Sequence, residues 1–263
     1  MNPFSSVNVP FISVCMATFN GEKYIHDQLN SIASQLSEGD EIVIVDDSSS
    51  DNTISEIELI SRLYLQVSFR LHVNEKNIGH ILSFQKAIML SRKPLVFLSD
   101  QDDVWLPHKV SIYRTIFTLE PSCNLIQSDH VLIDESGHLL SPSYLSSVTF
   151  LPFRLPIINH LGHGPSLAFT RNCLSYILPF PSKVASHDQW IAQICSFNGR
   201  VKHLPFQCQA YRVHSGQFTS QGRRPLILMI LNRFNMLASL LSRTSSFVLS
   251  KSFLGQSKDP LVL

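Results

Sequence analysis

Apolar runs alternate with amphipathic segments along the first hundred residues of the chain. Four runs rich in apolar and β-branched residues are typical of buried strands: FISVCMATF, EIVIVDD, FRLHV and PLVFLS. Between them, apolar residues recur every three or four positions over 25–36, and residues 53–64 and 79–90 favour two further helices. Strands that alternate with helices predict a mostly parallel central sheet with helices on both faces, which is an α/β fold.

The ends of the first two predicted helices carry signals of their own. Gly39 is expected to end the first helix. Asp51 is a plausible N-cap of the second, and a capping box of Thr53 with Glu56 is the alternative.

The pattern changes after residue 105. Residues 106–117 predict a helix with Pro107 in its first turn, and residues 124–140 predict extended segments around a turn at 135–137. Further elements follow in order: a Pro-rich connection over 143–156, a loop and strand over 162–171, a helix over 186–199 ended by glycine, short strands over 200–205 and 207–214, and helical pieces after 215.

Length and composition fit one large domain with an appendage. The chain has 263 residues, 44% of them hydrophobic, so it can bury a full core. We expect a domain over residues 1–215 and a helical extension over 216–263. No uninterrupted apolar run approaches the ~18 residues of a spanning helix, and the first residues lack the pattern of a signal peptide. Five scattered cysteines without CxxC spacing predict reduced core residues of a cytoplasmic protein.

Charge is unevenly distributed, although the net charge is only +1. Residues 189–258 contain nine Lys or Arg and no acidic residue, whereas residues 1–188 hold 19 of the 20 acids. This asymmetry suggests an anionic partner near the C-terminus. Two interpretations of residues 225–254 stay open: helices packed on the domain, or a cationic amphipathic surface on the inner face of the plasma membrane. No nucleic-acid partner is expected.

Polar clusters follow three of the predicted strands. Thr18 closes the first, Asp46 and Asp47 close the second, and the stretch SDQDD, with Asp100 and Asp102, closes the fourth. In an open α/β sheet, ligands bind beyond the carboxyl ends of the strands, so these clusters should meet at one edge. Closely spaced carboxylates without nitrogen or sulfur ligands suit a hard cation, Mg²⁺ or Mn²⁺.

Two other interpretations of the acidic residues carry less weight. A lone DxD is most often a solvated turn, but here it follows a buried strand and shares an edge with Asp46. The pair Asp46 and Asp47 also resembles the acidic pair of a phospho-receiver domain. That pair normally ends the first strand, and here another strand and helix precede it.

Taken together, five stretches resemble the family 2 inverting glycosyltransferases of GT-A fold, and within them the rhamnosyltransferase-like group of bacterial polysaccharide synthesis: ATFNGEKYI, VIVDDSSSDNT, NEKNIG, FLSDQDDVW and HDQWIA. The resemblance covers roughly residues 11–215. It implies transfer of a hexose-type sugar from a nucleotide diphosphate donor to a hydroxyl of a glycan or lipid-linked acceptor.

The resemblance also assigns roles on the donor side. Ala17, Thr18 and Asp46 would line the base and ribose pocket, with Asp47 and Asn77 nearby.

The resemblance also implies residues that bind the metal ion and the leaving diphosphate. Asp100 and Asp102 would hold the Mn²⁺ or Mg²⁺ that binds the diphosphate, and Arg212 and His214 could meet the diphosphate or close over the donor. For His214, an ordinary edge-strand residue is an equal alternative.

On the acceptor side, Asp188 in SHDQWIA matches the family's catalytic base, although Ser186 or Asp188 could instead cap that helix. Gln189 stands where relatives often have an aromatic residue, which affects the expected acceptor pocket but not the base. Gly162 and Gly164 would permit close backbone approach.

Two alternatives to this function remain. A nucleotidyltransferase can share the strand order and a metal aspartate, but usually opens with a Gly-rich loop that carries Arg and Lys. A non-catalytic receiver or sugar-binding module would not turn over a sugar nucleotide.

Overall fold

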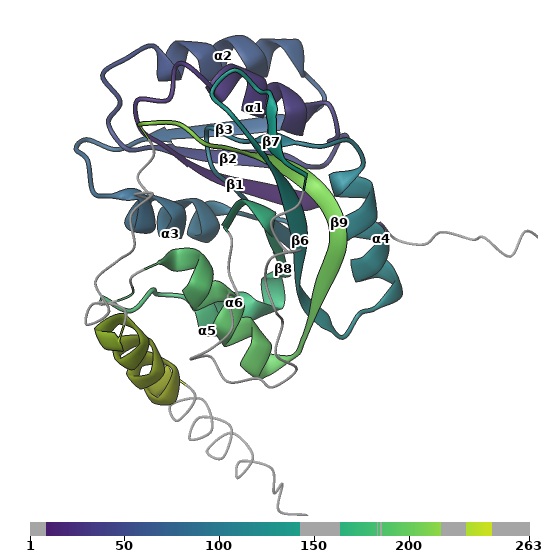
Figure 1. Cartoon of the computed structure of the whole chain (residues 1–263), viewed down its shortest axis with the longest axis vertical. Coiled ribbons are helices and arrows are strands. Elements are labelled where there is room, and N and C mark those ends of the chain that lie inside the picture. Colours follow the sequence, from purple (N-terminus) through teal and green to yellow (C-terminus); the bar gives the residue numbers. More distant parts are fainter. Residues whose placement is uncertain (1–8, 143–163, 183, 185, 217–229, 244–263) are drawn as a thin grey trace, which may run out of the picture.

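The structure is a computed structural model, and it describes residues 9–142, 164–182, 184, 186–216 and 230–243. Within these residues one mixed sheet contains all nine strands, in the order β3-β2-β1-β4-β8-β6-β9-β5, with β7 paired to β6 (Figure 1). The strands are β1 (Ile12–Thr18), β2 (Glu41–Asp46), β3 (Ser68–Val73), β4 (Leu95–Ser99), β5 (Val104–Trp105), β6 (Cys123–Ile133), β7 (Leu139–Ser141), β8 (Leu167–Thr170) and β9 (Arg200–Arg212).

Strands β1 to β4 are parallel neighbours, as the alternating pattern predicts. Strand β8 runs antiparallel to both β4 and β6, and β9 runs parallel to β6. The α/β fold class is therefore confirmed, but the sheet is mixed and not mostly parallel, because four of the eight described strand pairs are antiparallel.

Helices cover both faces of the sheet (Figure 1). They are α1 (Ile25–Ala33), α2 (Thr53–Leu63), α3 (His80–Leu90), α4 (Lys109–Leu119), α5 (Leu174–Ile177) and α6 (His187–Asn198), with 3₁₀ turns η2 (Gly164–Ser166) and η3 (Arg171–Cys173). One apolar core packs α1, α2 and α4 on one face, and a second packs α3, α5 and α6 on the other. Burial of alternate faces of the same strands explains why β1, β2 and β4 read as continuous apolar runs.

Helix ends differ in detail from the sequence expectations. Helix α1 ends at Ala33, and Gly39 lies in the following turn with a φ of +94°. Helix α4 begins at Lys109, so Pro107 precedes the helix instead of lying in its first turn. At the start of α2, Asp51 accepts hydrogen bonds from the amide and hydroxyl of Thr53, while the Glu56 carboxylate contacts His26.

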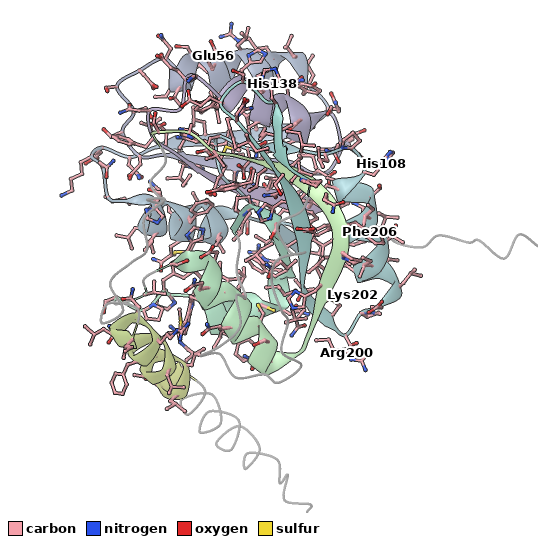
Figure 2. All side chains as sticks on the ribbon, viewed as in Figure 1. Glu56, His108, His138, Arg200, Lys202 and Phe206 are labelled. Atoms are coloured by element: carbon pink, nitrogen blue, oxygen red, sulfur yellow. The ribbon has the colours of Figure 1, made fainter. Side chains whose placement is uncertain are left out.

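The two short strands expected over 200–205 and 207–214 form one strand, β9, that ends at Arg212. Its register against β6 shifts where Leu204 faces Ser128 and Gln207 faces Asp129. Pro205 and the exposed Phe206 occupy this irregularity (Figure 2), where a residue without an amide hydrogen is tolerated. Pro205 therefore bends the strand without ending it.

Part of the expected C-terminal extension packs on the domain. Residues 230–243 form a helix whose Met236 and Leu240 join the core around α5 and α6. Arg243 donates hydrogen bonds to the carbonyl oxygens of Leu178 and Pro179. The rest of the extension and the Pro-rich connection over 143–156 lie outside the described residues. Among the helices described, none is long and apolar enough to cross a membrane.

A buried ion pair joins α4 to the turn before β2. Arg114 donates to both carboxylate oxygens of Asp40, at 2.7 and 2.6 Å, and Asp40 also accepts the amides of Ile12 and Ser37. We predict that Arg114→Met lowers the free energy of unfolding by about 3–5 kcal/mol, because it leaves a buried carboxylate without its cation.

Chemical denaturation measures this loss. Arg62→Met is the matched control, because its pair with Glu58 on α2 is exposed, and it should change stability by less than about 1 kcal/mol. Equal losses in the two variants would contradict a special role for the buried pair.

Candidate active site at the carboxyl edge of the sheet

The carboxyl ends of β2, β1 and β4 lie side by side, because these strands are neighbours in the sheet. Thr18 and Asp46 are register partners, and the Thr18 hydroxyl donates to Asp46 at 2.8 Å. The amide and hydroxyl of Ser49 also donate to Asp46, whose carboxylate is fully buried. Ala17 precedes Thr18 on β1 and is half-buried. The structure thus brings together the three residues expected around a base and ribose.

Asp47 holds the loop that leads into α3. It accepts the amides of Ile78 and Gly79, at 2.9 and 2.8 Å, and the side-chain amide of Asn74. Burial alone would raise the pKa of Asp47, but these hydrogen bonds outweigh it and hold the pKa below its usual value. Asn77 is exposed in the same loop.

The acidic stretch after β4 forms a tight cluster. Carboxylate oxygens of Asp100, Asp102 and Asp103 all lie within 4.8 Å of one another. Burial and then the negative charges of Asp102 and Asp188 raise the pKa of Asp100 well above its usual value. Burial and its two acidic neighbours do the same to Asp103. Like charges this close favour either a proton or a bound cation.

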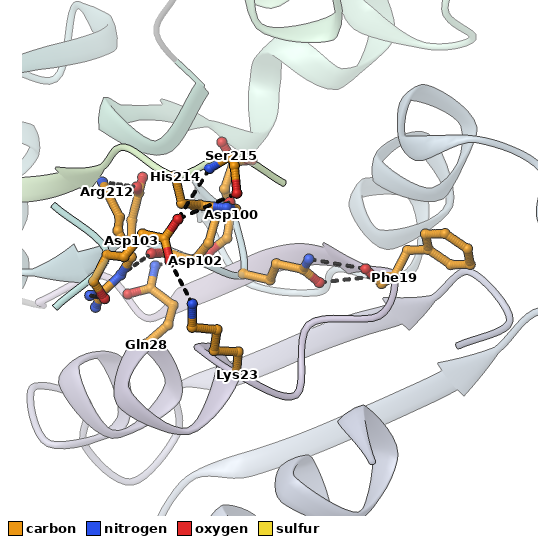
Figure 3. Close-up of polar contacts among 11 residues, drawn as sticks. Phe19, Lys23, Gln28, Asp100, Asp102, Asp103, Arg212, His214 and Ser215 are labelled. Atoms are coloured by element: carbon orange, nitrogen blue, oxygen red, sulfur yellow. Dashed lines mark hydrogen bonds and ion pairs between the residues drawn. The ribbon is translucent and has the colours of Figure 1, made fainter. Parts of the chain in front are cut away.

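Neighbouring side chains fix the backbone around this cluster (Figure 3). Gln28 of α1 donates to the Ser99 hydroxyl at 2.7 Å and to the Asp100 carbonyl at 3.0 Å. The Gln101 side chain pairs with both the amide and the carbonyl of Phe19. The acidic loop is therefore tied to α1 and to the end of β1.

The end of β9 closes over the same loop. The Arg212 amide donates to the Asp103 carboxylate at 3.0 Å, and the Arg212 guanidinium donates to the carbonyls of Asp102 and Glu135. The His214 ring nitrogen Nε2 lies 3.0 Å from the Asp102 carboxylate (Figure 3). His214 therefore faces the acidic cluster directly. Arg212 is buried, and it binds the Asp103 carboxylate and the Asp102 backbone carbonyl of the loop.

Asp188 lies in the first turn of α6. Its carboxylate accepts the Gly164 amide at 3.0 Å, so the turn η2 touches it. Asp188 also contributes to the raised pKa of Asp100, which places its charge within reach of the acidic cluster. Ser186 is the N-cap residue of α6, but its side chain makes no capping hydrogen bond. The late acidic motif thus lies near enough to Asp100 to act on it electrostatically.

The donor set fits a hard divalent cation. Asp100 and Asp102 are half-buried and can turn carboxylate oxygens toward a ligand, which is the chemistry that Mg²⁺ and Mn²⁺ prefer. Asp103 is fully buried and already accepts the Arg212 amide, so it supports the loop from behind.

The sequence pattern does not assign a role to three residues around the site. Gln28 and Lys109 are buried on helix faces that otherwise carry apolar side chains, and Gln101 lies between the acidic residues. A polar residue on the apolar face of a predicted helix was the available signal for the first two.

Comparison with known proteins identifies relatives of this chain. The family model for Glycosyl transferase family 2 matches residues 13–123, which include Thr18, Asp46, Asp100 and Asp102. An uncharacterized glycosyltransferase of Nostoc sp. is 28% identical over 217 residues, which make up 77% of this chain and 65% of that protein. The dTDP-rhamnosyl transferase RfbG of Shigella flexneri is 36% identical over 98 residues, 36% of this chain and 34% of that protein.

The comparisons support a family 2 glycosyltransferase. The chain also resembles solved structures in fold. S. aureus TarS in complex with UDP-GlcNAc superposes with a TM-score of 0.65 at 21% identity, over 94% of this chain and 76% of that one. The mannosyltransferase PcManGT of Pyrobaculum calidifontis, in complex with GDP-Man and Mn²⁺, superposes with a TM-score of 0.61 at 14% identity, over 95% and 76%.

The family match ends before the late site residues. It stops at Cys123, whereas Asp188, Arg212 and His214 follow much later in the chain. The chain also spans less than two thirds of the Nostoc relative's length. Geometry, and not the family match, therefore carries the argument for these three residues.

Proposed function

We propose that this protein is an inverting glycosyltransferase that moves a hexose-type sugar from a nucleotide diphosphate donor to a hydroxyl acceptor, in cell-surface polysaccharide synthesis. The carrying observation is the cluster of Asp100, Asp102 and Asp103 carboxylates at the carboxyl edge of the sheet, with Asp188 held by the Gly164 amide near enough for its charge to raise the pKa of Asp100. TarS with UDP-GlcNAc and PcManGT with GDP-Man, which share the fold, support a nucleotide sugar as the donor.

In this proposal, Asp100 and Asp102 hold a Mn²⁺ or Mg²⁺ ion on the donor diphosphate. When bound, the ion neutralises the charge that develops on the leaving diphosphate. The Mn²⁺ in the PcManGT complex supports this assignment. Thr18, Ala17 and Asp46 would contact the nucleoside, with Asp47 and Asn77 shaping the adjoining loop.

Asp188 is the proposed general base. Its carboxylate takes the proton of the acceptor hydroxyl as that oxygen forms a bond to the anomeric carbon. The bond from that carbon to the diphosphate oxygen breaks on the opposite face, and its electron pair leaves with the diphosphate. Attack opposite to the leaving group inverts the configuration. The Gly164 amide keeps one Asp188 oxygen in place and so orients the carboxylate.

The donor sugar is the less constrained part of the proposal. RfbG, a dTDP-rhamnosyl transferase that is similar to this chain over 98 residues, supports a rhamnosyl-type sugar. Metal-dependent hydrolysis of a sugar nucleotide would separate this enzyme from a non-catalytic sugar-binding module. Release of a nucleoside diphosphate instead of pyrophosphate would separate it from a nucleotidyltransferase.

The metal role makes a prediction about binding. Asp102→Asn keeps the side-chain volume and removes a charged ligand, so nucleoside diphosphate affinity should fall at least tenfold in Mn²⁺ and stay unchanged in EDTA. Isothermal calorimetry measures both. Asp46→Asn is the matched comparison, because its loss of affinity should persist in EDTA. Wild-type protein that transfers sugar at full rate in EDTA would end the metal assignment.

The base role makes a prediction about turnover. Asp188→Asn should cut sugar transfer by about 10²–10⁴-fold, the usual contribution of a positioned acid or base. Donor affinity should change little, because the carboxylate acts on the acceptor. A steady-state assay with the donor titrated measures both quantities. Collapse of donor affinity with unchanged turnover at saturation would assign Asp188 to nucleotide binding instead.

We further propose that the helix over 230–243 rests on an anionic membrane that carries a lipid-linked acceptor. Four large apolar side chains on this helix are at least half exposed: Ile230, Leu231, Phe234 and Leu241. They lie away from the Met236 and Leu240 side that packs on the domain. The surrounding region, residues 189–258, is basic and lacks acidic residues. Exposed apolar residues beside basic ones suit an interfacial helix.

This proposal predicts binding to vesicles. The intact protein should sediment with vesicles that contain phosphatidylglycerol at low salt and release at high salt. Phe234→Asp should weaken the binding severalfold. Leu65→Asp, at an 86% exposed position after α2, is the control and should bind as wild type. Equal loss in both variants, or no binding at low salt, would overturn the membrane proposal.

A further inference from the structure

Lys109, the first residue of α4, carries a buried amine behind the acidic cluster. Its side chain has no exposed surface. Its Nζ donates to the Pro165 carbonyl at 2.6 Å and to the Gln209 side-chain oxygen at 2.9 Å, and lies 4.1 Å from the centre of the Trp105 ring. Among the described residues, no carboxylate lies within ion-pair distance of this Nζ.

Stability alone does not account for a lysine at this position. Burial lowers the pKa of Lys109 to about 7, which reflects the cost of a charge without an adjacent counter-ion. Replacing buried charged groups by apolar side chains of similar volume is often neutral or stabilising. A methionine could fill the same space, but it could not donate to Pro165 or Gln209.

The two acceptors of Lys109 lead to the two acidic parts of the site. Pro165 belongs to η2, whose first residue, Gly164, donates its amide to the Asp188 carboxylate at 3.0 Å. Gln209 extends its amide toward the Asp103 carboxylate at 3.4 Å. Lys109 therefore links the turn that holds Asp188 to the back of the acidic cluster.

A second residue of α4 fixes the same turn. The Tyr113 hydroxyl donates to the Ser166 carbonyl at 2.6 Å, one turn along the helix from Lys109. Two successive carbonyls of η2 are thus held by two buried donors from one face of α4. This leaves the Gly164 amide directed at Asp188, with little freedom for η2 to shift.

We propose that Lys109 is a positioning residue for Asp188: by holding the Pro165 carbonyl it sets the turn whose Gly164 amide orients the Asp188 carboxylate. The proposal rests on the proposed function of Asp188 as the base. It adds a residue that touches neither donor nor acceptor and acts through η2. A shift of about 1 Å in a catalytic group can cost on the order of 10²-fold in rate.

The first test compares Lys109→Met with wild type in steady-state transfer. We expect the turnover number to fall about 10–100-fold, with the Michaelis constant for the donor within twofold of wild type. Lys202→Met is the control, because Lys202 pairs with Glu120 away from the site, and it should leave both constants unchanged. Wild-type turnover in Lys109→Met would overturn the proposal.

A double variant separates positioning from charge compensation. If Lys109 served only as a counter-charge for Asp103, then removing both charges in Lys109→Met/Asp103→Asn should restore turnover above that of Lys109→Met. The positioning role predicts that the double variant stays at least as slow as Lys109→Met. Recovery of turnover in the double variant would overturn the proposal. Tyr113→Phe keeps the charge and should slow turnover severalfold, and it carries the test if Lys109→Met does not fold.

Hydrogen exchange gives a readout that does not depend on sugar transfer. In Lys109→Met, the Gly164 amide should exchange at least tenfold faster than in wild type, while amides of β4 keep their rates. If wild-type protein transfers no sugar, the proposed function fails, and the exchange rates still report whether Lys109 holds η2. An unchanged Gly164 rate in an active Lys109→Met variant would overturn the positioning role.

Discussion

Repulsion among Asp100, Asp102 and Asp103 is the constraint on which the rest of the site depends. Two unit charges within 4.8 Å repel each other by on the order of 3 kcal/mol at the effective dielectric near a protein surface. A loop that carries three such groups would spread apart unless its backbone were held. Gln28 of α1 holds the loop directly, Gln101 ties it to the Phe19 backbone after β1, and the Arg212 amide stabilises the Asp103 carboxylate by a hydrogen bond. The closeness of the carboxylates is thus maintained by the fold, as a cation site requires.

The C-terminal strand completes this arrangement, although it lies more than 90 residues after the acidic loop. Strand β5 follows the loop directly, and its partner in the sheet is β9, with Val104 opposite Ala210. Strand β9 also carries Arg212 and leads to His214, which contacts Asp102. The loop is therefore bounded on one side by β4 and on the other by a strand from the far end of the domain. The family match over residues 13–123 therefore leaves out the parts of the site that come from α6 and from the end of β9.

The sequence predicted what depends on local pattern. Apolar periodicity predicts strands β1 to β4 and their helices, and the order of these strands places Thr18, Asp46 and Asp100 at one edge of the sheet. The sequence predicts two short strands over 200–205 and 207–214, whereas the structure has one strand, β9, in which Pro205 is tolerated at a bulge against β6. The role of Lys109 was equally hidden: its acceptors are 56 and 100 residues away, and no local pattern identifies them.

Electrostatic coupling between the two acidic parts explains why positive groups lie buried behind them. The Asp188 charge raises the pKa of Asp100, and because such coupling is reciprocal, the acidic cluster also acts against an ionised Asp188. Lys109 is among the groups that lower the pKa of both Asp100 and Asp103, and its hydrogen bond to Pro165 keeps the Gly164 amide beside Asp188. Lys109 thus acts on Asp100 and Asp103 through its electric field, and on Asp188 through the backbone of η2. Exposed charges are screened by salt, whereas a buried amine such as that of Lys109 is screened much less.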